Sequence, residues 1–84
     1  MTLLLMVARR TGEGERQVRE NSWSGWRPTH MMATRATGKT LGLIGMGRIA
    51  RAVARRAVGG FGMRILFHDP VPPKEEDIKG LNAT

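Results

Sequence analysis

The chain has 84 residues, room for one small domain at most, and a domain of this size buries only about 60% of the surface that its unfolded chain exposes. It has a formal net charge of +7, from 14 Lys and Arg against 7 Asp and Glu, and it has no cysteine for a disulfide or a thiolate metal site. The basic residues form no continuous tract, so we do not expect a nucleic-acid surface. The longest apolar run, residues 3–8, is far shorter than the ~20 residues that cross a bilayer, so we do not expect a membrane span. Because no basic residue precedes that run, a signal peptide is not expected and we predict a cytoplasmic chain.

Residues 2–20 are predicted to form one long helix, since Leu, Met, Ala, Arg, Glu and Gln favour that structure while Gly12 and Gly14 weaken its middle. The first turn and a half is apolar on every side, so we expect it to be buried against another element. Three pairs of opposite charge stand four residues apart on this segment: Arg9 with Glu13, Glu15 with Arg19, and Arg16 with Glu20.

Residues 21–39 have the composition of a loop, with Pro28 and Gly38 as breaks. Trp23 and Trp26 are expected to pack as apolar anchors within it, an interpretation we prefer to a ligand-binding role. The arginines that follow at 48, 51, 55 and 56 fall on one short helical segment, where a solvated face is the expected explanation for the charge.

Residues 40–44 are short, apolar and bounded by glycines, which indicates a buried strand. Residues 48–58 carry apolar side chains at four-residue spacing and predict a helix, ended by Gly59, Gly60 and Gly62. Residues 63–68 predict a second strand, stopped by Pro70, and one short helical turn is expected around residues 75–78.

The order strand, glycine turn, helix, strand predicts two parallel strands joined by a right-handed crossover. The fold class is therefore α/β: a partial Rossmann fold, with one βαβ mononucleotide-binding unit preceded by a long N-terminal helix. Two strands without further partners would expose their edges, so self-association is expected.

The turn after the first strand reads Gly45-Met46-Gly47-Arg48-Ile49-Ala50 and matches the pattern G-x-G-x-x-G/A. Gly45 permits the tight turn, Gly47 lets a pyrophosphate approach the backbone, and Ala50 lets the helix lie close to the strand. The helix begins here, so free N–H groups and the positive end of its dipole would face the phosphates. For Arg48 we prefer a role of the backbone N–H and leave the role of its side chain open.

Asp69 ends the second strand, close to the ~20-residue spacing at which the motif's acid follows. Its carboxylate could accept hydrogen bonds from the adenosine ribose hydroxyls, and it would repel a 2′-phosphate, which favours NAD over NADP. The alternative to dinucleotide binding is that the glycines serve only packing and that the aspartate only caps a turn. We prefer dinucleotide binding.

Nothing in the sequence indicates a catalytic or metal site. His30 and His68 are the only histidines, neither has a carboxylate at a recognisable spacing, and His68 and Asp69 are neighbours on a strand that point to opposite faces. We assign neither histidine a catalytic role.

The stretch from Gly38 to Ala50 resembles the start of the NAD-binding domain of the D-isomer-specific 2-hydroxyacid dehydrogenases. Upstream, residues 4–10 resemble the family's interdomain helix and residues 23–30 the loop after it. Downstream, residues 54–57 resemble its first crossover helix and residues 60–63 the entry to the next strand. The wording Trp26-Arg27-Pro28-Thr29-His30 is most like the glyoxylate and hydroxypyruvate reductase branch. The resemblance divides the chain into an interdomain-type helix at 1–20, a loop at 21–39 and a partial NAD-binding βαβ unit at 40–84.

The resemblance implies an oxidoreductase that interconverts 2-keto acids and D-2-hydroxy acids with NAD, in a homodimer with contacts through the first helix. It places Gly45, Gly47, Arg48, Ile49 and Ala50 at the pyrophosphate and Asp69 at the ribose. The family's catalytic histidine, arginine and glutamate follow well downstream of the motif, so we expect an incomplete chain that has no turnover by itself.

Three alternatives remain open on the sequence. The first is a non-catalytic nucleotide-binding or regulatory module that uses the same βαβ unit. The second is a protein that binds nucleic acid through its net positive charge. The third is a truncated reading frame. Selective NAD or ADP binding without a dehydrogenase partner would favour the first, and steep salt-dependent DNA affinity the second.

Overall fold

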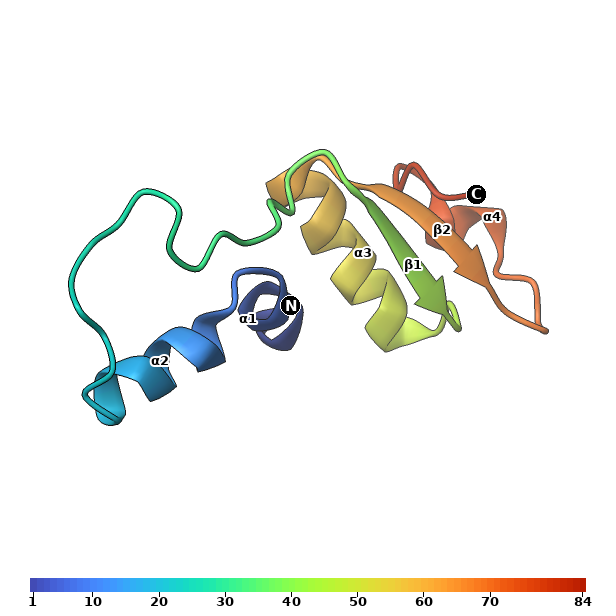
Figure 1. Cartoon of the computed structure of the whole chain (residues 1–84). Coiled ribbons are helices and arrows are strands. Elements are labelled where there is room, and N and C mark those ends of the chain that lie inside the picture. Colours follow the sequence, from blue (N-terminus) through green and yellow to red (C-terminus); the bar gives the residue numbers. More distant parts are fainter. The chain divides into compact units, whose positions relative to one another are not determined.

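The computed structural model describes all 84 residues, which form two compact units, Met1–Arg35 and Ala36–Thr84. The N-terminal unit contains helices α1 (Thr2–Ala8) and α2 (Thr11–Arg19). The C-terminal unit contains strand β1 (Thr40–Ile44), helix α3 (Arg48–Phe61), strand β2 (Arg64–His68) and the short helix α4 (Glu75–Ile78) (Figure 1). None of these helices is long and apolar enough to span a membrane.

The single helix expected over residues 2–20 is wrong: the helix breaks at Arg9 and Arg10. Arg10 adopts the left-handed conformation, with φ of 56°. The carbonyl of Ala8 accepts a hydrogen bond from the Thr34 amide at 2.9 Å, and the Arg10 guanidinium donates to the Met32 carbonyl at 3.2 Å. The loop thus supplies partners that a continuous helix would not use, and the break comes before the two glycines.

The apolar N-terminal turns are not buried within this chain, contrary to expectation. Helix α1 has no buried residue, and Leu3 and Val7 are exposed. Residues 21–39 form no regular helix or strand, as predicted, but Trp23 and Trp26 are exposed and do not act as apolar anchors.

Charged pairs on α2 only partly follow the predicted spacing. Arg19 pairs with Glu15 at 2.9 Å, as expected. Glu13 pairs with Arg10 instead of Arg9, because the left-handed Arg10 turns its guanidinium toward the first turn of α2.

The two strands are parallel, as predicted, with Thr40 opposite Arg64 and Ile44 opposite His68. This register brings the carboxyl ends of both strands to the same end of the sheet. Figure 1 shows α3 running alongside the sheet. β1 is not the buried strand that we expected: its residues alternate between exposed and half-buried, and Ile44 is 98% exposed.

Helix α3 packs against both strands and buries small residues. Ala54 and Ala57 of the helix and Ile65 of β2 are fully buried, and the other buried residues of the unit are Ala36, Met46, Met63 and Leu81. α3 runs to Phe61, three residues beyond the predicted end at 58, and β2 begins at Arg64 instead of Met63. Gly62 alone ends the helix, in the left-handed conformation with its amide bonded to Ala57 and Val58 carbonyls.

The tail after β2 returns to the sheet. α4 lies at the predicted residues 75–78, and Leu81 after it is buried. The Ile65 amide then donates to Asn82 (3.2 Å), the Phe67 amide to Thr84 (3.1 Å), and the Thr84 amide to Ile65 (3.0 Å). The expectation that both strands would lack further partners is therefore wrong for β2, because residues 82–84 pair with its outer edge in a parallel bridge.

Candidate functional site

The chain leaves β1 through the glycine turn, by which we mean Gly45–Ala50. Gly45 has φ of 96°, a conformation that favours glycine, and its amide donates to the His68 carbonyl at 2.7 Å. That bond continues the strand pairing one residue beyond β1. The glycine turn therefore lies at the carboxyl end of both strands, as a ligand site of an open α/β sheet requires.

Neither backbone conformation nor packing within the chain requires a glycine at position 47. Its φ of −76° suits any residue, and a Cβ added there would meet no other atom of the chain within 4 Å. It is the residue before α3, and no side chain caps the first amide groups of that helix. The space beside this backbone is therefore open from outside the protein.

Asp69 lies against the glycine turn. Its Oδ2 accepts a hydrogen bond from the Met46 amide at 2.7 Å, and its Oδ1 accepts one from the Val71 amide at 2.8 Å. The Met46 bond is the main cause that lowers the pKa of the Asp69 carboxyl below its ordinary value, with Val71 second. The carboxyl is thus ionised at neutral pH.

Met46 is a structural residue of the site that the sequence analysis did not single out. Met46 is only 3% exposed, while the glycines on either side have free space around them. The buried side chain anchors the middle of the turn and holds the Met46 amide toward Asp69. The only signal in the sequence was an apolar residue between the two glycines of the motif.

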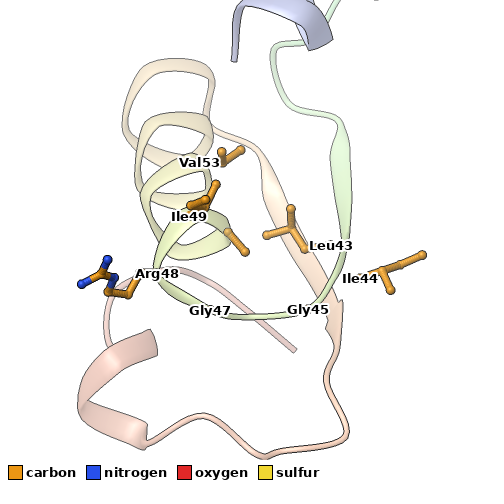
Figure 2. Close-up of a pocket in the computed structure, with 8 residues that line it drawn as sticks. Leu43, Ile44, Gly45, Gly47, Arg48, Ile49 and Val53 are labelled. Carbon is orange, nitrogen blue, oxygen red and sulfur yellow. The ribbon is translucent and has the colours of Figure 1, made fainter.

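An open hollow of about 620 Å³ lies between the end of β1 and the start of α3. It is lined by Leu43, Ile44, Gly45, Gly47, Arg48, Ile49, Ala50 and Val53. In Figure 2 the Leu43, Ile49 and Val53 side chains point into the space between strand and helix, whereas the Arg48 guanidinium points away from them. Five of the six predicted site residues thus line one hollow, and Asp69 is joined to the glycine turn by the hydrogen bond from the Met46 amide.

Neither histidine lines the hollow. His30 belongs to the N-terminal unit, where Nε2 is 2.8 Å from the Gln17 Oε1 and Nδ1 is 3.1 Å from an Arg27 nitrogen. His68 is exposed at the end of β2. No cluster of three or more His, Cys, Asp or Glu residues could hold a metal ion.

The model of the D-isomer specific 2-hydroxyacid dehydrogenase NAD-binding domain matches residues 1–84. The chain belongs to this family. Among curated relatives it is 50% identical over 78 residues to a glyoxylate reductase of Korarchaeum cryptofilum, covering 92% of this chain and 23% of the relative. It is 43% identical over 84 residues to a glycerate dehydrogenase of Hyphomicrobium methylovorum, covering 100% of this chain and 26% of the relative.

Solved structures support the same family assignment. The apo form of D-mandelate dehydrogenase from Rhodotorula graminis superposes with a TM-score of 0.79 at 31% identity, over 98% of this chain and 25% of that one. The chain thus spans about a quarter of the length of the proteins it matches. The predicted Rossmann-type unit and the predicted dehydrogenase family are confirmed, with NAD as the cofactor of the family's domain.

Proposed function

We propose that the glycine turn binds the adenosine diphosphate part of NAD. The amide groups at Gly47, Arg48, Ile49 and Ala50 would face the pyrophosphate, with Gly45 forming the turn and Ala50 keeping the helix close to the strand. Asp69 would accept hydrogen bonds from the adenosine ribose hydroxyls. When bound, NAD supplies the hydride acceptor of the dehydrogenase reaction.

The observation that carries this proposal is Gly47. Neither its backbone conformation nor packing within the chain calls for a glycine, so an external group can approach the backbone there. Other glycines also have free space, but Gly47 is the one that precedes the uncapped amides of α3. The uncapped amides of α3 next to it suit an anion, and the residues around them therefore fit a diphosphate.

Asp69 supports NAD in preference to NADP. Two backbone amides hold the carboxyl ionised, and each oxygen keeps a further lone pair for a ribose hydroxyl. A 2′-phosphate at the same place would bring two negative groups together. Calorimetric titration of the chain with NAD, NADP and ADP-ribose tests both points: NAD and ADP-ribose should bind and NADP should bind at least tenfold more weakly. Equal affinity for NADP would contradict the assigned role of Asp69, and no binding of either NAD or ADP-ribose would contradict the site itself.

The substrate proposal follows from the relatives. The curated relatives include glyoxylate reductases and a glycerate dehydrogenase. We therefore propose that a protein containing these residues interconverts a small 2-keto acid, such as glyoxylate or hydroxypyruvate, and the corresponding D-2-hydroxy acid. The 84 residues contribute the cofactor site, and none of them is proposed as the proton donor.

We further propose a homodimer. The exposed apolar side chains of α1, among them Leu3 and Val7, are surface that a second copy would remove from water. Light scattering coupled to gel filtration measures the mass directly. A species of about twice 9.3 kDa supports the proposal, and a monomer at high micromolar concentration contradicts it.

A further inference from the structure

Arg51 connects the start of α3 to a segment that follows β2. Its Nη1 pairs with the Asp77 Oδ2 of α4 at 2.6 Å, and its Nε donates to the Gly47 carbonyl at 3.3 Å. The Arg51 side chain is only 18% exposed, so this is not a freely solvated arginine. The solvated role expected for all four arginines of the helix is therefore wrong for Arg51.

The Gly47 carbonyl receives two donors from this one residue. The Arg51 backbone amide donates to it at 3.0 Å as the first intrahelical bond of α3, and the Arg51 guanidinium donates at 3.3 Å. Because a peptide unit is planar, fixing the carbonyl of Gly47 also fixes the direction of the Arg48 N–H on the other side of the same plane. Arg48 is one of the residues that line the hollow, where the proposed pyrophosphate would be.

Asp77 in turn fixes the guanidinium. α4 is held by the burial of Leu81 and by the pairing of residues 82–84 with β2, so Asp77 is attached to the sheet independently of α3. The pair also neutralises the charge of Arg51, which leaves the backbone amides to provide the attraction for the diphosphate.

We propose that Arg51 is a positioning residue for dinucleotide binding. Held by Asp77, its guanidinium orients the Gly47–Arg48 peptide so that the Arg48 amide faces the diphosphate. This inference rests on the proposed NAD site and deepens it. It predicts that Arg51 affects the diphosphate part of the ligand and leaves the adenosine part unaffected.

The test compares Arg51→Ala with Arg56→Ala in the full chain. Arg56 is a matched control, since its guanidinium also donates to the carbonyl four residues before it, that of Ala52 at 2.9 Å, but away from the glycine turn. Titration with ADP-ribose should show about a tenfold loss of affinity for Arg51→Ala and less than a twofold loss for Arg56→Ala. Adenosine, which has the ribose but no diphosphate, should bind both variants as it binds the unchanged protein.

A second readout needs no ligand. In the ligand-free chain the amide resonances of Arg48 and Ile49 should shift in Arg51→Ala and remain in place in Arg56→Ala. Asp77→Asn should give a smaller shift in the same direction, because the guanidinium loses its ion pair with Asp77 but still donates to the Gly47 carbonyl.

The outcomes separate the two proposals. If the unchanged chain does not bind ADP-ribose, the proposed function fails, and this inference fails with it. If the unchanged chain binds ADP-ribose but Arg51→Ala loses no more affinity than Arg56→Ala, or loses adenosine and ADP-ribose affinity equally, the positioning role alone is overturned. Unchanged Arg48 and Ile49 resonances in Arg51→Ala overturn it as well.

Discussion

At the scale of single residues, Asp69 combines a structural and a proposed binding role. The alternative interpretation of the sequence was an aspartate that only caps a turn, and the carboxylate does accept two backbone amides. Those bonds link the end of β2 to the glycine turn and keep the carboxyl ionised. The structural role is thus observed, and the ribose role stays a prediction.

The lowered pKa of Asp69 gives a pH dependence with a definite sign. Because the folded chain binds this proton less readily than the unfolded chain, its contribution to stability is present above the ordinary pKa of about 3.9 and is lost as the pH falls through the lower folded value. Unfolding midpoints measured between pH 2 and 7 should therefore fall more steeply in the unchanged chain than in Asp69→Asn. Glu76→Gln, which removes an exposed carboxylate, is the control, and equal slopes for Asp69→Asn and the unchanged chain would contradict the assignment.

Gly47→Ser separates ligand binding from folding. Serine is at least as good as glycine before the first turn of a helix, and the added side chain has free space within the chain. The free energy of unfolding should stay within about 0.5 kcal/mol of its value in the unchanged chain. NAD affinity, measured by calorimetry, should fall at least tenfold, equivalent to about 1.4 kcal/mol. Retained affinity would show that no ligand approaches this backbone.

At the scale of elements, α3 illustrates how a helix ends. Gly59 and Gly60 were expected to stop it with Gly62, yet the helix passes through both and ends only where Gly62 turns left-handed. The Phe61 carbonyl accepts a hydrogen bond from the Gly38 amide at 2.9 Å, so the turn that precedes β1 contributes to the position of the last turn of the helix.

Two glycine substitutions in α3 should have opposite effects. Gly62→Ala should lower the free energy of unfolding by about 1 kcal/mol, since a left-handed conformation with φ of 57° strains any residue that has a Cβ. Gly59→Ala, in the helix with free space around it, should raise it by about 0.5–1 kcal/mol. Denaturant titration followed by circular dichroism measures both, and the same sign for both would refute this account of the helix end.

At the scale of the whole molecule, the chain belongs to the family's NAD-binding domain, and none of its residues is assigned as an acid or base. His30 is hydrogen-bonded to Gln17 in the N-terminal unit and His68 is exposed at the end of β2. Hydride transfer to a keto acid requires a positioned proton donor. We therefore expect no turnover from these 84 residues. Oxidation of NADH by the purified chain with glyoxylate, measured at 340 nm against a no-substrate control, would refute this expectation.

Several elements could be predicted because they depend on residues that are neighbours in the chain. Strand 40–44, the glycine turn, the start of α3 and the helical turn at 75–78 could all be predicted, because their conformations follow from local apolar spacing and from a glycine at φ of 96°. The proximity of Asp69 to the turn was also predictable, since parallel strands place their carboxyl ends together.

Where the other elements break, extend and pair depends on contacts between residues that are far apart in the chain. Ala8 bonds to Thr34 and breaks the first helix, Phe61 bonds to Gly38 beyond the expected end of α3, and Arg51 reaches Asp77. In each case a hydrogen-bonding group finds its partner more than 20 residues away, and no local propensity specifies such a partner.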